Sequence, residues 1–326
     1  MTTALLRVRG LCKHFPVFDK GLLRRQIGLV RAADELSFDV MRGETLGMVG
    51  ESGSGKTTAG RTILRAYEPT SGSAVFDDGQ SEAVDLATLS EEELKPLRRR
   101  LQMIFQDPFS SLNPRMTVRD LVAEPLIIHR LARGDELEDR VTDMLRKVGL
   151  QPEHRRRYPH AFSGGQRQRI GIARALIMHP GLVVCDEAVS ALDVSVQAQV
   201  INLLEDLQAE LGLTYLFIAH DLSVVRHICD RVAVMYAGRI VELAPTEELF
   251  ATPRHPYTRA LLSAVPNPDP DVTMVDALGG EVADPGNLPS GCSFHPRCPL
   301  ATDGCRGEPP QMRELSNDHQ VSCHQA

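Results

Sequence analysis

Residues 50–57 combine the residue types that bind the phosphate groups of a nucleotide. They read Gly-Glu-Ser-Gly-Ser-Gly-Lys-Thr, match the pattern G-x-x-x-x-G-K-S/T, and lie between an apolar run, LGMV, and a helical pattern, TTAGRTILRA. Glycines let backbone N–H groups turn toward phosphates, and a helix N-terminus adds its dipole. We expect Lys56 to reach the β- and γ-phosphates and Thr57 to bind Mg²⁺. The expected ATP-binding residues of this segment are Gly50, Ser52, Gly53, Ser54, Gly55, Lys56, Thr57 and Thr58.

Two adjacent carboxylates follow the apolar run LVVC. A strand buried in a parallel sheet presents such residues at its C-terminal end, where ligands bind in open α/β sheets. Asp186 is suited to the Mg²⁺ shell, directly or through water, and Glu187 to the role of general base for an attacking water. An apolar strand before Asp-Glu is weak evidence alone, but after a phosphate-binding loop it favours nucleotide hydrolysis.

Other segments resemble the motifs of the ABC ATPases. The sequence SGGQ opens the helical pattern RQRIGIARAL and resembles the family's signature motif. The resemblance implies that a nucleotide held by an opposite subunit is contacted by Ser163, Gly165 and Gln166. Gln106, after LQMIF, matches the Q-loop and is a further expected Mg²⁺ and catalytic residue. His220, after TYLFIA, matches the switch histidine, and residues 190–193 resemble the D-loop that meets the other subunit.

ABC ATPases usually stack an aromatic side chain from the N-terminal strands on the adenine base. Phe15, in KHFPV, is the expected residue, in preference to Phe18. The alternative is that Phe15 is an ordinary core residue.

A wider resemblance covers roughly residues 5–325 and is to the peptide importers, the bacterial dipeptide and oligopeptide permeases with their nickel and glutathione relatives. It is carried by KHFPV, VGESGSGKTT, MIFQDPFSSLNPRMTV, YPHAFSGGQRQRIGIARAL, SALDVSVQAQV, YLFIAHDLSVVRHICDRVAVMYAGRIVE and HPYTRALLSAVP. It implies an ATPase that pairs with a second, homologous but non-identical ATPase subunit beneath two transmembrane permease subunits, fed by an extracytoplasmic solute-binding protein. ATP would be sandwiched between the two ATPases at the cytoplasmic face of the inner membrane.

The elements that must position these residues alternate between strands and helices. Apolar runs at 182–185 and 214–219 predict buried strands, and helical patterns at 56–66, 166–178, 195–211 and 221–229 follow the strands. The alternation indicates an α/β domain with a mostly parallel central sheet. With the resemblance, it predicts an ABC-type P-loop domain over residues 1–262, which also has an antiparallel β subdomain and an inserted helical subdomain at about 107–165.

The composition limits the function classes. The net charge of −7 and pI of about 5.9 do not indicate nucleic-acid binding. No apolar run is long enough to span a bilayer, and the N-terminal residues lack the apolar region of a signal peptide, so membrane contact is expected through partners. A single cassette without a long coiled-coil insertion disfavours DNA-repair and translation ATPases. The sequence HPYTRALLSAVP favours an importer over an exporter, and Glu187 with His220 disfavours a redox protein with a vestigial ATPase.

Residues 263–326 form an expected C-terminal extension that is rich in Pro, Gly and Asp and poor in aliphatic residues, so we expect it to be disordered, docked, or held by a metal. It contains four of the seven cysteines, Cys292, Cys298, Cys305 and Cys323. The absence of a close C-x2–4-C pair favours an iron–sulfur cluster, most simply 4Fe–4S, over zinc. Zinc, with His295 or His324, and unliganded thiols are the alternatives. Because no phosphate ligand lies in the extension, we expect changes there to affect ATP affinity little.

Overall fold

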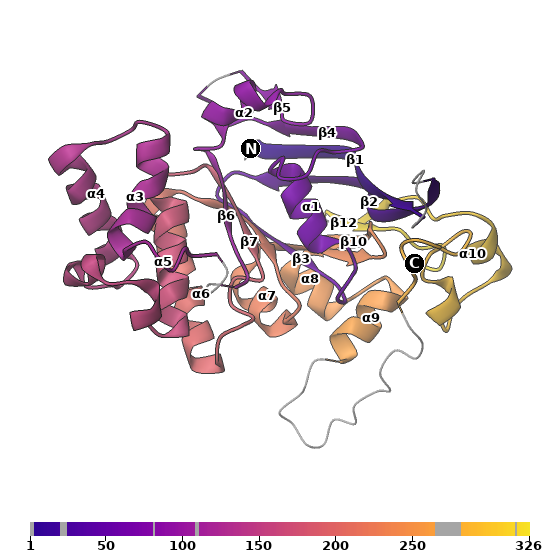
Figure 1. Ribbon diagram of the computed structural model, residues 1–326. Helices are drawn as coiled ribbons and strands as arrows, with labels where there is room; N and C mark the ends of the chain where they lie inside the picture. The colour runs from indigo at the N-terminus through magenta and orange to yellow at the C-terminus, as the bar shows by residue number, and fades with distance from the viewer. Residues whose placement is uncertain (1–2, 20–24, 81, 108–110, 265–281, 317) are drawn as a thin grey trace.

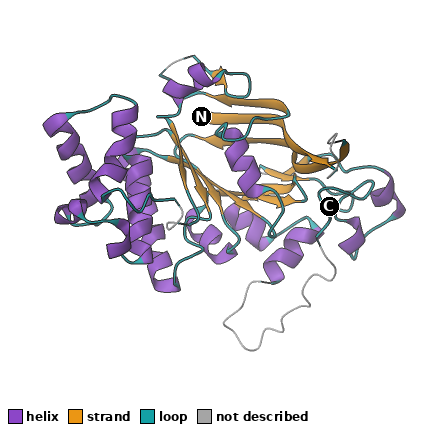
Figure 2. Cartoon of the chain, in the orientation of Figure 1, coloured by secondary structure: helices purple, strands orange, loops and turns teal. Residues whose placement is uncertain are grey.

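The computed structural model describes residues 3–19, 25–80, 82–107, 111–264, 282–316 and 318–326, and these residues form two sheets and a helical layer (Figures 1 and 2). The larger sheet has the strand order β11-β12-β10-β9-β3-β8-β7-β6, and the smaller one β2-β1-β4-β5. The strands are β1 Ala4–Phe18, β2 Gln26–Met41, β3 Thr45–Val49, β4 Ser71–Phe76, β5 Val84–Asp85, β6 Leu101–Ile104, β7 Leu182–Asp186, β8 Thr214–Ile218, β9 Arg231–Tyr236, β10 Arg239–Pro245, β11 Arg313–Ser316 and β12 His319–Val321. The helices are α1 Lys56–Ile63, α2 Glu91–Leu97, α3 Val118–Ile128, α4 Gly134–Lys147, α5 Gly164–Leu176, α6 Val194–Leu211, α7 Leu222–Ile228, α8 Thr246–Ala251, α9 Pro256–Ser263 and α10 Asp303–Gly307.

The centre of the larger sheet is parallel, as the sequence predicts. Strands β6, β7, β8, β3 and β9 pair in parallel, and β3, β7 and β8 are buried along their whole length. Burial on both faces explains why these strands read as unbroken apolar runs. Their C-terminal ends share one edge of the sheet, and the chain leaves that edge at Gly50, Glu187 and Ala219.

Helix α1 lies between the two sheets. Its buried Ala59 and Ile63 pack in one cluster with Leu36 of β2 and Ile218 of β8. The antiparallel sheet therefore covers the same helix that begins at the phosphate-binding loop. This arrangement, together with the parallel core, confirms the predicted P-loop α/β fold with an antiparallel β subdomain.

Helices α3, α4 and α5 stand together on the side away from the antiparallel sheet (Figure 1). α4 is amphipathic and buries Leu137, Val141, Met144 and Leu145, whose spacing places them on one face. Thr117 caps the N-terminus of α3, and its hydroxyl accepts a hydrogen bond from the Asp120 N–H. α5 packs against both α3 and α4, so the helical layer is joined directly to the helix that starts with the signature motif.

Residues 282–316 and 318–326 of the C-terminal extension are docked on the main domain. β12 pairs with β10 and extends the larger sheet, and the ring of Phe294 is only 1% exposed among the aromatic residues Tyr236 and Tyr257. His319 is fully buried and its Nε2 lies 2.7 Å from Glu242 Oε1. The extension, which has few apolar residues of its own, is thus held by contacts with the hydrophobic core of the main domain. Residues 265–281 lie outside the described residues.

Candidate functional site

The loop between β3 and α1 needs glycine at two points of close backbone approach. Gly50 has φ 150°, and a Cβ there would lie 2.2 Å from the Met235 carbonyl oxygen. Gly55 has φ 102°, and a Cβ would lie 1.9 Å from the carbonyl oxygen of Ala32. The loop is further fixed because the Gly238 N–H donates to the Ser54 carbonyl at 2.9 Å. Ser52 and Gly53 are exposed at its rim, and Thr58 lies in the first turn of α1.

Lys56 is buried at the centre of this loop. Its Nζ donates to the carbonyl oxygens of Gly50 at 2.7 Å and Glu51 at 2.9 Å, and to Ser54 Oγ at 3.3 Å. Burial lowers the pKa of Lys56, while the nearby carboxylates of Glu187 and others oppose that shift. A desolvated ammonium group ringed by oxygen atoms is prepared to exchange carbonyl acceptors for phosphate oxygens.

Thr57 and Asp186 meet beside the loop. Thr57 Oγ1 donates to Asp186 Oδ1 at 2.7 Å, and Arg61 Nη2 lies 3.7 Å from Asp186 Oδ2. Burial raises the pKa of Asp186, although Thr57 and Arg61 act in the opposite direction. A buried carboxylate with a raised pKa gains from a nearby cation, and an all-oxygen pair is the donor type that Mg²⁺ prefers.

The expected general base lies at the same edge of the sheet. Gln106, after β6, donates through Nε2 to Glu187 Oε2 at 2.7 Å, and His220 Nδ1, after β8, lies 3.4 Å from the same oxygen. Glu187 has a positive φ of 49° and its N–H donates to the Ile218 carbonyl at 2.9 Å. A small pocket of about 60 Å³ is lined by Glu187, Ser190 and His220 among others. Parallel pairing of three strands thus brings together residues that are far apart in the sequence.

The signature segment caps α5. The Gln166 N–H donates to Ser163 Oγ at 3.4 Å, the Ser163 N–H donates to Gln166 Oε1 at 3.1 Å, and Ser163 is exposed. Gly165 faces the start of α6, because a Cβ there would lie 2.3 Å from Val196 Cγ1. The helix N-terminus is consequently open on one side and backed by α6 on the other.

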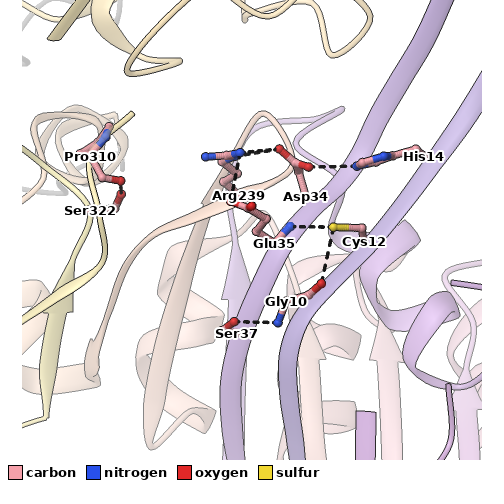
Figure 3. Close-up of polar contacts among 9 residues, drawn as sticks. All are labelled: Gly10, Cys12, His14, Asp34, Glu35, Ser37, Arg239, Pro310 and Ser322. Carbon is pink, nitrogen blue, oxygen red and sulfur yellow. Dashed lines mark hydrogen bonds and ion pairs between the residues drawn. The ribbon is translucent and has the colours of Figure 1, made fainter. Parts of the chain in front are cut away.

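Phe15 lies on the β1–β2 hairpin and is half-buried, with its ring edge-on to Tyr67 at 5.7 Å and the Lys13 ammonium 4.8 Å from its centre. Phe18 is 49% exposed. The hairpin is fixed by a chain of polar contacts in which Asp34 binds His14 Nε2 at 2.9 Å and Arg239 at 2.8 Å (Figure 3).

The four cysteines of the extension are gathered within it. The Cys292 N–H donates to the Cys305 carbonyl at 2.8 Å. Burial raises the pKa of the Cys292 thiol, and the thiols of Cys323, Cys305 and Cys298 act in the same direction.

The tail sulfur atoms are nevertheless not packed as tightly as ligands of a single metal ion. Among the described residues, the one group of three or more His, Cys, Asp or Glu ligand atoms within 4.8 Å of each other is Cys12, His14 and Asp34, on the β1–β2 hairpin. Of the tail histidines, His295 contacts the carbonyl oxygen of Cys292 and His324 that of Glu308, whereas His319 contacts the Glu242 carboxylate.

Sequence reasoning missed three residues around the loop, Glu51, Tyr257 and Arg297. The Glu51 N–H donates to Tyr257 Oη at 2.9 Å, and its carboxylate pairs with Arg297 at 2.8 Å. One signal was available in the sequence, since an acid inside an anion-binding loop needs a cationic partner.

Comparison with known proteins agrees with this geometry. Residues 33–190 match the family model "ABC transporter", and residues 241–305 match "Oligopeptide/dipeptide transporter, C-terminal region". The chain is 52% identical to the oligopeptide transport ATP-binding protein AppF of Bacillus subtilis, covering 98% of this chain and 97% of that one. It is 53% identical to a putative peptide import ATP-binding protein of Brucella ovis, over 98% of both chains.

Two solved structures share the fold. The ATP-binding cassette MJ0796, described as a dimer bound to ADP and Pi, superposes with a TM-score of 0.64 at 26% identity and covers 74% of this chain and 98% of its own. CbiO1 of Clostridium perfringens, part of an ABC transporter complex, gives a TM-score of 0.64 at 28% identity over 76% and 91% of the two chains. None of the helices in the described ranges has the length and apolar composition that crossing a bilayer requires.

Proposed function

Because the chain belongs to the ABC transporter family and is an ATPase of its oligopeptide/dipeptide branch, we propose that it couples ATP hydrolysis to uptake of di- or oligopeptides or a related small solute. The observation that carries the proposal is the meeting of Gln106, Glu187 and His220 beside the Thr57–Asp186 pair, at the mouth of the phosphate-binding loop. Phosphoryl transfer needs such positioning of charge more than covalent chemistry.

Each residue then has a stated role. The loop's N–H groups and Lys56 bind the β- and γ-phosphates, and Thr57, Asp186 and Gln106 provide oxygen ligands for Mg²⁺, which neutralises charge on the phosphate oxygens when bound. Glu187 accepts a proton from the attacking water, and His220 orients it. Phe15 stacks on adenine, since its half-buried ring is supported by Tyr67.

We assign the signature residues Ser163, Gly165 and Gln166 to the nucleotide of a second, homologous ATPase subunit. The exposed Ser163 at an open helix N-terminus and Val194, 83% exposed at the start of α6, support a contact face there. The test compares ATP turnover per site in the isolated chain and in the assembled transporter. Assembly is expected to raise turnover, and an isolated monomer as fast as the complex would contradict a shared site.

One of the two permease subunits is proposed to dock in a groove of about 660 Å³ between α3, α5 and the core. Phe105, 39% exposed, and Ile128, 58% exposed, offer apolar surface. In the described part of the chain, the groove is lined by more arginines than carboxylates, with Glu124 its one acidic residue, which suits an apolar helix with an acidic side chain. Phe105 directly precedes Gln106, so a docked helix would act on the residue that holds Glu187. The subunit would therefore lie at the cytoplasmic face of the inner membrane, below permeases supplied by an extracytoplasmic solute-binding protein.

For the extension, divided from the ATPase unit at 262/263, we propose a 4Fe–4S cluster held by Cys292, Cys298, Cys305 and Cys323. Thiolates bound about 2.3 Å from one zinc ion lie about 3.8 Å from each other. Among the described residues, no three of these four sulfur atoms lie within 4.8 Å of one another. A polynuclear cluster holds its thiolates further apart, which favours a cluster over zinc.

The colour and metal content of the protein test this proposal. Anaerobically purified protein should be brown and contain iron, and Cys298→Ser should bleach it. A colourless protein with stoichiometric zinc would support the alternative, and an equally ordered, metal-free extension would exclude both.

A further inference from the structure

The extension reaches back to the phosphate-binding loop through one arginine. Arg297 ends a short 3-10 helix, His295–Arg297, and the next residue is Cys298. Its Nη1 donates to Glu51 Oε2 at 2.8 Å and its Nη2 to Glu51 Oε1 at 3.1 Å. The arginine side chain is only 5% exposed and the Glu51 side chain 28%, so this two-point contact is partly shielded from solvent. It joins residues that are 246 positions apart.

The same loop residue is held at two further points. The Glu51 N–H donates to Tyr257 Oη at 2.9 Å, and the Glu51 carbonyl accepts from Lys56 Nζ at 2.9 Å. Tyr257 in turn packs against the ring of Phe294 at 5.4 Å, three residues before Arg297. One segment of the extension therefore supplies both the ring behind Tyr257 and the guanidinium on Glu51.

We propose that Arg297 is a positioning residue for ATP binding. It neutralises Glu51 and fixes the phosphate-binding loop, and through it the C-terminal extension sets the affinity for ATP. The proposal rests on the assignment of residues 50–57 to the ATP phosphates. Without Arg297, the Glu51 carboxylate stands unpaired beside a triphosphate and repels it. The freed carboxylate also competes with the phosphates for the Lys56 ammonium.

This contact argues against the expectation that changes in the extension leave ATP affinity nearly unchanged. Cys298 follows Arg297 directly, and the Cys298 N–H donates to the His295 carbonyl at 3.2 Å, so the thiol and the guanidinium belong to one turn of chain. Any change that displaces Cys298 shifts Arg297 with it. ATP affinity therefore reports on the state of the extension.

The test measures binding of a non-hydrolysable ATP analogue with Mg²⁺ to the full-length chain by calorimetry, and the KM and kcat of the assembled transporter. Arg297→Ala should raise the dissociation constant about tenfold, within the usual range for coupled sites, and raise KM similarly while kcat changes less than about twofold. The double variant Glu51→Gln with Arg297→Ala should return the dissociation constant to within about twofold of Glu51→Gln alone, because no unpaired charge remains. Arg306→Ala, on the same extension but exposed and paired with Asp303 three residues before it, is the matched control and should bind like the wild type.

The outcomes separate the two levels of inference. Failure of the wild-type chain to bind the analogue would refute the assignment of the loop and not the coupling. Wild-type affinity in a folded Arg297→Ala chain, checked by thermal unfolding, would overturn the proposal. If Arg297→Ala weakens binding and the double variant does not recover, charge neutralisation is wrong.

Discussion

Replacing Glu187 with glutamine tests the general base with little disturbance of the site. Glu187 Oε2 accepts a hydrogen bond from Gln106 at 2.7 Å and lies 3.4 Å from His220 Nδ1. The amide oxygen of a glutamine in the same rotamer accepts from both groups, so the variant keeps the geometry and loses the ability to take a proton. Its backbone N–H still donates to the Ile218 carbonyl, which preserves the positive-φ turn.

The expected loss in kcat is about 10²–10⁴-fold, which corresponds to about 2.7–5.5 kcal/mol in the activation barrier. ATP binding should persist, because Lys56, Thr57 and Asp186 are unchanged. The assay is steady-state ATP hydrolysis by the assembled transporter, with nucleotide binding measured on the same preparation. If two ATPases share the site as proposed, the closed, ATP-loaded form should accumulate, because the variant keeps the bound ATP that joins them.

A second Glu–His pair in the chain provides the control. Glu205 Oε2 lies 3.5 Å from His227 Nε2 on the surface, and Glu205→Gln removes the same charge from the same kind of pair away from the loop. That variant should hydrolyse ATP at the wild-type rate. A kcat for Glu187→Gln within about threefold of the wild type would refute the assignment of Glu187 as base.

Three further changes test other parts of the structure. Phe294→Ala removes a ring that is 1% exposed and should cost the docked extension about 3–5 kcal/mol, seen as faster amide hydrogen exchange over residues 282–326, whereas Leu300→Ala, 47% exposed in the same extension, should not. Burial lowers the pKa of His255 to about 4, so the unfolded chain binds more protons between pH 4 and 6.5 and stability rises with pH across that window. In urea unfolding, the wild type should therefore lose about 2 kcal/mol more free energy of unfolding than His255→Asn between pH 7 and 5. Asparagine keeps the N-cap of α9 and does not titrate. Equal losses in the two proteins would contradict a buried neutral imidazole. Thr57→Val removes the hydroxyl bonded to Asp186 and should raise the Mg²⁺ concentration for half-maximal hydrolysis at least about tenfold, and an unchanged Mg²⁺ titration would exclude Thr57 as a ligand.

The sequence predicted the parts of the fold that depend on local patterns. The short, unbroken apolar runs of β7 and β8 are typical of strands buried on both faces, and the helices after them follow from short connections. Glu187 and Gln106 could be placed together because residues at the ends of neighbouring parallel strands share an edge.

The sequence could not predict contacts between distant segments that share no pattern. The antiparallel pairing of β12 with β10 consists of two residue pairs, Glu242 with Val321 and Leu243 with Gln320. It brings His319 to Glu242, and neither segment has a periodic pattern that predicts this contact. The extension reads as polar and loop-rich because its few buried side chains, Phe294 among them, complete a core that belongs to residues 236–257. The pairing of Arg297 with Glu51 depends on that docking. The loop sequence alone could therefore predict that Glu51 has a cationic partner, but not which residue provides it.

The two polar supports of the site act on different steps of the reaction, because they hold different groups. Arg297 and Tyr257 hold Glu51 in the loop; if that loop binds the phosphates as proposed, before and during transfer alike, weakening these contacts should raise KM with little change in kcat. Gln106 and His220 contact Glu187; if Glu187 is the proposed general base, its role begins when water attacks, and weakening these contacts should lower kcat. Because Gln106 follows the groove residue Phe105 and Arg297 precedes Cys298, a permease helix would act on turnover and the extension on ATP affinity. A change in the extension that altered kcat alone would contradict this division.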